Sequence, residues 1–280
     1  MVPDDLTIYI PTHGRLTRQV TWAALPPSVR EITTLVAEET EADVLQALGY
    51  PVIPHQERGI GDIREWVLRQ HTTGGYVLLL DDDLRIDFRR RDDRSKFLKP
   101  RKGEAIEKMV REYRRLLDFA PLAGIAPRGG ANRTPSPYRF NTRMFGAWGG
   151  DPSGRLRMGV QFNRVSLMED FDVFLQVLSR GHMIPVLNTF VVGDAASNTS
   201  GGCSSYRTNL TQSEAAVSLA ELWPDYVKLV ERPAWDGMEG DTRLDVRIQW
   251  GKAYKDGVRA RGEESNFPLD GESAWYTEEG

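Results

Sequence analysis

Tyr76-Val-Leu-Leu-Leu-Asp81-Asp82-Asp83 is a continuous apolar run that leads directly into three carboxylates. Such a run, preceded by Gly74-Gly75, is typical of a strand buried on both faces, so the acids follow its carboxyl end. In open α/β sheets that end borders the ligand crevice. Clustered carboxylate oxygens suit Mg2+ or Mn2+, ions that also contact substrate phosphates. An acidic, solvated turn is the commoner explanation of an isolated Asp triplet, and the remaining sequence decides between the two.

The composition is that of a folded globular protein. The chain has 280 residues, of which 40% are hydrophobic and 27% are charged, so it can bury a large core and is not extensively disordered. The length suits one α/β domain with a tail or two modest domains. The net charge of −4 says little about partners, but residues 89–102 contain eight Lys or Arg against two Asp.

Cysteine content and the terminus suggest a cellular compartment. Cys203 is the single cysteine, which excludes an internal disulfide and a cysteine-based metal site. The N-terminus lacks the segments of a signal peptide, and no window approaches the ~18 apolar residues of a membrane span. We therefore expect a soluble, cytoplasmic protein with no membrane partner.

Short apolar runs alternate with helix-like stretches before the Asp triplet. Strands are expected at Leu6–Ile10, Glu31–Ala37, Val52–Pro54 and Tyr76–Leu80. A helix over 63–70, with Asp62 as its N-cap, is expected before the last of these. The alternation predicts an α/β fold with a Rossmann-like, mostly parallel central sheet flanked by helices.

The rest of the chain is less regular. Helices are expected over Glu104–Leu117 and from Met168 to Leu178. Other expectations are a loop at 88–102, loops and short strands at 121–154, strands at 158–163 and 183–192, a mobile lid at 195–211 and a helix at 212–222. We expect a catalytic domain at 1–231, with a donor half at about 1–87 and an acceptor half at about 104–231, and a polar, irregular C-terminal extension at 232–280.

Four motifs stand in a recognisable order along the chain. They are Pro11-Thr-His-Gly-Arg15, Arg58-Gly-Ile-Gly-Asp-Ile-Arg64, Asp81-x-Asp83 and Glu169-Asp170. Together they resemble the GT-A glycosyltransferases, over roughly residues 6 to 195. The resemblance implies a GT-A fold and transfer of a sugar from a nucleotide-sugar donor.

The resemblance implies roles for the acids. Asp83 would bind Mn2+ or Mg2+, and Asp81 would contact the donor and share the ion, which stabilises charge on the leaving diphosphate. Asp82 would be structural, because its side chain points to the other face of an extended segment. Asp194 follows the last strand, where many relatives place a metal-binding His, and is a possible third ligand. His182 is the alternative by residue type, although a lone His is more often structural.

Two further sets follow from the same resemblance. Five residues are candidate nucleotide-sugar contacts, with arginine suited to phosphate and glycine to close backbone approach: Thr12, Arg15, Arg58, Gly61 and Arg64. In the alternative without a functional role, Arg15 is a surface charge and Arg64 is a solvated helix residue. In the catalytic pair Glu169-Asp170, Asp170 would be the general base that deprotonates the acceptor hydroxyl. Its alternative is an ordinary acid in the first turn of a helix.

The particular residues of these motifs further resemble those of the TET/JBP-associated glycosyltransferases, which modify hydroxymethylated pyrimidines in DNA. That resemblance implies UDP-glucose as donor and 5-hydroxymethylcytosine or 5-hydroxymethyluracil in DNA as acceptor. A basic block would lie close to the donor pocket and bind DNA: Arg89, Arg90, Arg91, Arg94, Lys96, Lys99, Arg101 and Lys102. Its alternative is a solvated loop. Tyr138 and Trp148 are candidates for an acceptor pocket that receives a flipped base, with burial in the core as the equal alternative for Trp148.

The main hypothesis is therefore an inverting, metal-dependent DNA glycosyltransferase. A second keeps the enzyme class but replaces DNA with a polysaccharide, a protein, a small molecule or an already attached sugar. A third is a non-catalytic DNA-binding protein with a GT-A fold.

Overall fold

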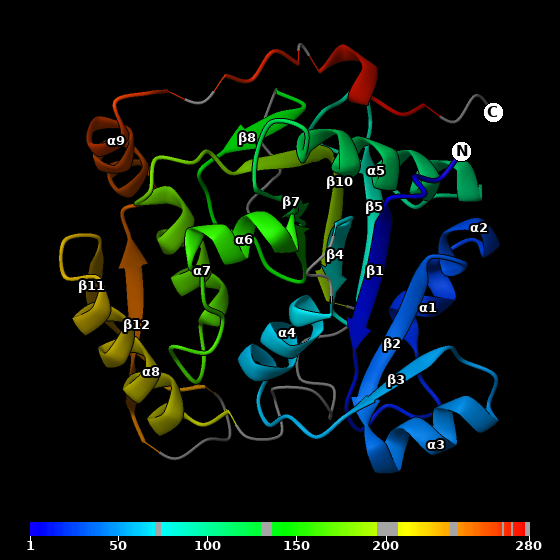
Figure 1. Ribbon diagram of the computed structural model, residues 1–280, viewed down its shortest axis with the longest axis horizontal. Helices are drawn as coiled ribbons and strands as arrows, with labels where there is room; N and C mark the ends of the chain where they lie inside the picture. The colour runs from blue at the N-terminus through cyan, green and yellow to red at the C-terminus, as the bar shows by residue number, and fades with distance from the viewer. Residues whose placement is uncertain are drawn as a thin grey trace.

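The computed structural model describes residues 1–70, 74–129, 136–194, 207–235, 240–264, 266–269 and 271–277. Its centre is a mixed sheet with the strand order β3-β2-β1-β4-β9-β7-β10-β5-β6, and β8 pairs with β10 (Figure 1). Helices flank this sheet, and β11 and β12 form a separate two-stranded sheet. The expected α/β fold is therefore present.

The first half of the chain builds the parallel part of the sheet. Its strands are β1 (Leu6–Pro11), β2 (Thr33–Glu38), β3 (Val52–His55) and β4 (Tyr76–Leu80). The connecting helices are α1 (Val20–Ala24), α2 (Pro27–Arg30), α3 (Glu39–Ala47) and α4 (Ile60–Arg69). The four strands were expected. Helix α4 begins earlier than predicted, because Gly59, at φ +90°, and not Asp62 is its N-cap.

The second half adds strands of both directions. They are β5 (Leu84–Arg89), β6 (Phe97–Leu98), β7 (Leu122–Pro127), β8 (Tyr138–Phe140), β9 (Ala147–Gly150) and β10 (Pro185–Asp194). The helices are α5 (Gly103–Leu116), α6 (Pro152–Met158) and α7 (Glu169–Leu178). Strands β7 and β10 run parallel to each other, whereas β9 and β5 are antiparallel to their neighbours.

Three predictions in this half are wrong or incomplete. The loop expected from Phe88 starts too early, because Leu84, Ile86 and Phe88 alternate inward along β5. No strand forms at 158–163: residue 158 ends α6, and Gly159 follows in the left-handed region at φ +65°. Helix α6 itself was not predicted. The boundary of the expected lid is also shifted, since α8 (Asn209–Leu222) begins before residue 212, and residues 195–206 lie outside the described part of the chain.

The sheet has an apolar cluster on each face. Leu6, Ile8 and Ile10 of β1 pack with the apolar side of α5 in one cluster. Tyr9 of the same strand belongs to the other cluster, which includes apolar residues of α4 and α7. This alternation along one strand is the expected consequence of side chains that point to opposite faces.

The C-terminal part is regular, contrary to the expectation of an irregular extension. It contains β11 (Val227–Pro233), β12 (Thr242–Ile248), α9 (Trp250–Arg261) and the short 3-10 helix η2 (Glu272–Ala274). The hairpin β11–β12 lies beside α8 at the side of the molecule, and the last segment crosses back over the sheet near α5 (Figure 1). There Phe267 packs on Phe119 and Tyr138. The predicted boundary at 231/232 falls within β11, and the division into a domain and an extension stays a prediction.

Among the described residues, no helix has the length and apolar character needed to cross a bilayer.

Candidate active site

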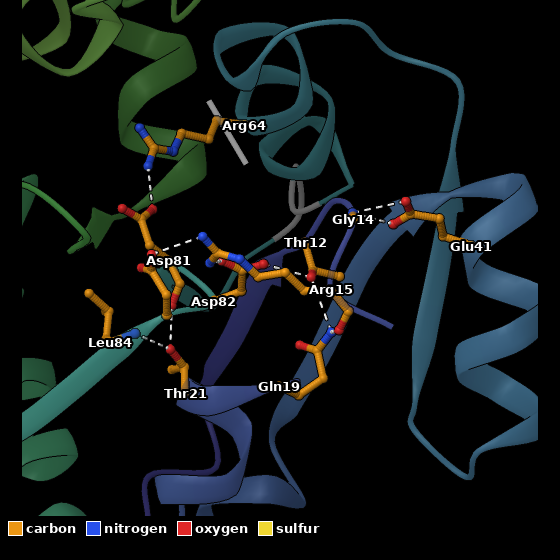
Figure 2. Close-up of polar contacts among 11 residues, drawn as sticks. Thr12, Gly14, Arg15, Gln19, Thr21, Glu41, Arg64, Asp81, Asp82 and Leu84 are labelled. Atoms are coloured by element: carbon orange, nitrogen blue, oxygen red, sulfur yellow. Dashed lines mark hydrogen bonds and ion pairs between the residues drawn. The ribbon is translucent and has the colours of Figure 1, made fainter. Parts of the chain in front are cut away.

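The Asp triplet forms a tight turn between β4 and β5, at the carboxyl edge of the sheet, where β1, β4, β7 and β10 end. Thr21 of α1 holds this turn: its hydroxyl donates to the Asp81 carbonyl at 2.5 Å and accepts the Leu84 N–H at 2.8 Å (Figure 2). The Thr21 N–H also donates to the Asp82 carbonyl at 3.1 Å. The turn is therefore fixed by a residue that the sequence analysis did not single out.

Asp82 anchors the loop that follows β1. Its carboxylate accepts a hydrogen bond from the Thr12 hydroxyl at 2.7 Å and an ion pair from Arg15, and Gln19 donates to Thr12 at 3.1 Å (Figure 2). Burial raises the pKa of Asp82 to about 6, although the Thr12 hydrogen bond and the Arg15 charge both oppose that rise. The structural role expected of Asp82 is confirmed. Thr12 is itself buried, and its hydroxyl is used within this network, so its side chain is not among the nucleotide contacts that we propose.

Arg15 joins two members of the triplet. Besides Asp82, its guanidinium binds Asp83 at 3.0 Å, and the arginine side chain is only 9% exposed. The interpretation of Arg15 as a surface charge is therefore wrong. Any ligand of Asp83 would meet this guanidinium.

Arg64 joins the Asp triplet to the Glu169-Asp170 pair. Its guanidinium binds Asp81 at 2.9 Å and also pairs with Glu169, and it lies 5.0 Å from the centre of the Trp148 ring. The Arg64 side chain is 6% exposed, which excludes a solvated helix residue. One buried cation therefore holds two acids that are far apart in the sequence, one at the end of β4 and one at the start of α7.

Gly61 and Arg58, the other two nucleotide candidates in the same motif, have different surroundings. A Cβ at Gly61 would lie 2.6 Å from the Phe162 carbonyl oxygen, so the missing side chain lets α4 pack against the segment before α7. We therefore correct the prediction that Gly61 admits the nucleotide. Arg58 is exposed, next to Gly59, and stays a candidate nucleotide contact.

The two catalytic candidates lie in different environments. Glu169 is buried and paired with Arg64, which makes it a residue that positions that arginine. Asp170 is partly exposed, and its carboxylate accepts the Phe171 N–H at 3.0 Å. Burial is the main cause that raises the pKa of Asp170 well above its usual range, and the charge of Glu169 raises it further. The charges of Arg64 and Arg143 act in the opposite direction. A raised pKa suits a carboxylate that accepts a proton near neutral pH.

Asp81 and Asp83 fit a divalent ion that is shared with a substrate. The two side chains are 39% and 21% exposed, and each uses one carboxylate oxygen for an arginine. Mg2+ commonly binds one or two carboxylates and completes its shell with water and phosphate oxygens. The described residues contain no group of three or more His, Cys, Asp or Glu arranged to hold a metal, and the side chain of Asp194 lies outside the described part. Asp194 is placed only by its backbone, which pairs with Leu84 at the same edge.

A family comparison covers the part of the chain that contains these acids. A family model described as TET-Associated Glycosyltransferase matches residues 6–202, which contain every motif discussed above. The chain belongs to the TET-associated glycosyltransferase family. The prediction of a glycosyltransferase is thereby confirmed, and the α/β fold expected for it is the one observed.

Other comparisons find only distant similarity to this TET-associated glycosyltransferase. A search of curated proteins found no match. Among solved structures, GalNAc-T7 with UDP, GalNAc and Mn2+ is 12% identical with a TM-score of 0.47, over 79% of this chain and 49% of that chain. TarS of S. aureus is 13% identical with a TM-score of 0.40, over 77% of this chain and 39% of that chain. The chain thus spans about half or less of the length of these two structures.

The residues predicted for an acceptor pocket are buried. Trp148 is fully buried, stacked on Phe162 with ring centres 5.4 Å apart, so the alternative of a core residue is correct. Tyr138 is 4% exposed and packs edge-on against Phe267. Neither side chain is exposed to line a pocket, so neither is among the acceptor-binding residues that we propose.

The basic block of the TET-associated glycosyltransferase lies away from the Asp triplet. Strand β5 starts at the carboxyl edge and runs antiparallel to β10, so its five steps carry the chain about 17 Å toward the opposite edge. The expectation that the block lies close to the donor pocket is wrong for this reason. Arg89 is also fully buried: its Nε donates to the Asn188 carbonyl at 3.1 Å, and its guanidinium lies 4.7 Å from the Phe97 ring centre. Arg89 is therefore not among the residues that we propose contact DNA.

Proposed function

We propose that this TET-associated glycosyltransferase transfers a sugar from a UDP-sugar to the hydroxymethyl group of a 5-hydroxymethylpyrimidine in DNA, with inversion at the anomeric carbon. The observation that carries the proposal is the Arg64 bridge. It holds Asp81, on the proposed donor side, beside Glu169, the neighbour of the proposed base. Donor and acceptor groups must meet within a few ångströms for transfer, and this bridge brings their binding residues together.

The proposed donor site uses exposed oxygens and cations at the carboxyl edge. Asp83 and Asp81 would hold Mn2+ or Mg2+, which would supply Lewis-acid stabilisation of the leaving diphosphate. Arg58 would contact the nucleotide. Arg15, now paired with Asp82 and Asp83, would exchange part of that pairing for donor oxygens. The GalNAc-T7 structure contains UDP and Mn2+, which is consistent with this donor class.

In the proposed reaction, Asp170 is the base. Its carboxylate takes the proton of the acceptor hydroxyl as that oxygen attacks the anomeric carbon. The bond from the anomeric carbon to the diphosphate oxygen breaks, and UDP leaves with the electron pair. Attack from the face opposite the leaving group inverts the configuration. Glu169 keeps Arg64 in place and does not touch the reacting atoms in this scheme.

The family description, with its association with TET, is consistent with DNA as the acceptor, and the resemblance of the motifs implies hydroxymethylated pyrimidines. Glucose is the sugar that we propose for the donor. The basic block does not decide the acceptor, since it begins at the far end of β5.

The test is transfer by the purified protein. We expect duplex DNA that contains 5-hydroxymethylcytosine or 5-hydroxymethyluracil to gain one hexose in the presence of UDP-glucose and Mn2+, as measured by mass spectrometry. Unmodified DNA is the matched control and should gain nothing. Chelation of the metal should abolish transfer. Failure with every common UDP-sugar on both modified duplexes would refute the DNA acceptor and favour the alternative acceptors.

A further inference from the structure

A short loop reaches both halves of the candidate site. Residues 141–146 connect β8 to β9, and both ends of this loop are fixed. Asn141, at φ +53°, donates its N–H to the Ile184 carbonyl at 2.9 Å and accepts the Ile184 N–H with its side chain at 3.0 Å. At the other end, the Gly146 carbonyl accepts the Asp81 N–H at 2.8 Å. Met144, between them, is fully buried, so the loop is a fixed part of the site.

Arg143 is the cation that this loop presents. Its side chain is exposed, and its guanidinium lies 4.9 Å from the ring centre of Phe171 and 5.4 Å from that of Phe145. Phe171 directly follows Asp170, and the charge of Arg143 acts against the rise of the Asp170 pKa. The guanidinium is therefore near the proposed base and supported by two rings.

Arg143 differs from the other arginines of the site in its partners. Arg15 and Arg64 each bind two carboxylates. Within the described part of the chain, the Arg143 guanidinium makes ring contacts but no hydrogen bond or ion pair. A guanidinium that lies on aromatic rings keeps its N–H edge for an anion, and this edge fits a carboxylate or a phosphate bidentately. Phosphate is the anion that a DNA acceptor supplies.

We propose that Arg143 binds a phosphate of the acceptor DNA next to the modified base and so holds the acceptor hydroxyl at Asp170. This inference rests on the proposed function. A phosphate at this place could come from the DNA or from the donor diphosphate. The ring of Phe171 on α7 favours the DNA, because the donor side is built by the end of β4 and the Asp triplet. Arg143 is thus an acceptor-binding residue, with its effect on KM and not on the proton transfer.

The experiment compares Arg143→Ala with the wild-type enzyme on three ligands. For hydroxymethylated duplex DNA, we expect KM to rise about tenfold and the salt dependence of binding to weaken by about one phosphate contact. For the free 5-hydroxymethyl nucleoside, which has no phosphate, kcat/KM should stay unchanged. UDP affinity, measured by calorimetry with Mn2+, should also stay unchanged. The KM of Arg143→Lys for DNA should lie between those of the wild type and Arg143→Ala, because lysine keeps the charge without the bidentate fork.

Arg232→Ala is the matched control, since Arg232 is an exposed arginine on the β11–β12 hairpin and its loss changes the net charge equally. A fall in UDP affinity with unchanged DNA affinity would assign the phosphate to the donor and overturn the proposal. An unchanged KM and salt dependence for DNA would also overturn it. If the wild-type enzyme itself transfers no sugar to DNA, the proposed function fails, and that result is obtained before any variant is made.

Discussion

The two edges of the central sheet use positive charge in opposite ways. At the carboxyl edge, Arg15 and Arg64 are nearly buried, and each is paired with two carboxylates. At the far end of β5, the basic block consists mainly of exposed side chains, and Arg90 and Lys96 pair with the neighbouring Asp92 and Asp93. Buried charges need partners, whereas exposed charges are stabilised by water.

This difference teaches that charge density along a sequence is a poor guide to the site. The block stands out in the sequence because it holds eight cations within residues 89–102. The arginines that organise the acids are single residues in motifs, and their pairing becomes visible only in three dimensions. We expect the chemistry at the edge with the paired arginines and expect the basic edge to be remote from it.

The largest effect is expected for Asp170→Asn, which removes the proposed base. We expect kcat to fall by about 10²–10⁴-fold while UDP affinity is kept, because the loss is in proton transfer. The wild-type rate at saturating substrate should also fall as the pH is lowered through the raised pKa of Asp170, since the protonated carboxyl cannot accept the proton. Steady-state kinetics over a pH series measures both effects.

Glu104→Gln provides the control for that variant. Glu104 is the second residue of α5, as Asp170 is the second residue of α7, so both complement a helix dipole. Glu104 shares the helix-dipole role of Asp170 but not its proposed role as the base, so Glu104→Gln should leave kcat unchanged. Equal and small effects of the two variants would support the ordinary helix-acid interpretation of Asp170.

The second prediction separates two neighbours in the triplet. Asp83→Asn should lower transfer by roughly 10²-fold or more and weaken Mn2+ binding in the presence of UDP, because it removes a proposed ligand. Asp82→Asn should keep Mn2+ affinity but lower the free energy of unfolding by about 1–3 kcal/mol, because the amide replaces one of the two accepting oxygens with a donor and removes the charge that pairs with Arg15. Calorimetry and urea denaturation provide the two readouts. Identical behaviour of the two variants would contradict the split.

The third prediction concerns the bridge itself. Arg64→Ala leaves the carboxylate of Glu169 buried without its partner, and we expect the free energy of unfolding to fall by about 3–5 kcal/mol. Urea denaturation measures the loss. The double variant Arg64→Ala with Glu169→Gln removes the orphaned charge and should recover part of the stability. No recovery would mean that the cost comes from lost packing of Arg64 on Trp148.

The first half of the fold could be predicted because its strands are apolar runs separated by glycine and proline. Strand β5 was not predicted. One reason is that its sequence, Leu84-Arg-Ile-Asp-Phe-Arg89, has a charge at every second residue and leads into the basic block. The burial of Arg89 depends on the Asn188 carbonyl, 99 residues away in the chain. A local pattern contains no information on a contact of that range.

The same limit applies to the site. The motif order identified Arg15, Arg64, Asp81 and Glu169 as members of one site, but not their partners. The pairing of Arg64 with Glu169 spans 105 residues, and the packing of Gly61 on Phe162 requires the folded arrangement of α4 and α7. Thr21 carried no sequence signal of its own, because it acts through its place beside the Asp triplet. Arg143 lies within the stretch 138–148, whose interleaved aromatic and arginine residues suggested an acceptor pocket, but that pattern did not distinguish it from its neighbours.

The smallest effect is expected at the basic edge, and it gives the sharpest test of the comparison. A duplex of about eight base pairs with the modified base at its centre extends only ~14 Å on either side. That is shorter than the length of β5, so the triple variant Lys99→Ala, Arg101→Ala, Lys102→Ala should transfer sugar to it within about twofold of the wild-type rate. On a long duplex, the same variant should lose affinity most at low salt, because exposed cations act through counterion release. Arg143→Ala should show the reverse pattern, with its loss already present on the short duplex. A large loss by the triple variant on the short duplex would place the basic block at the site after all and remove the contrast between the two edges.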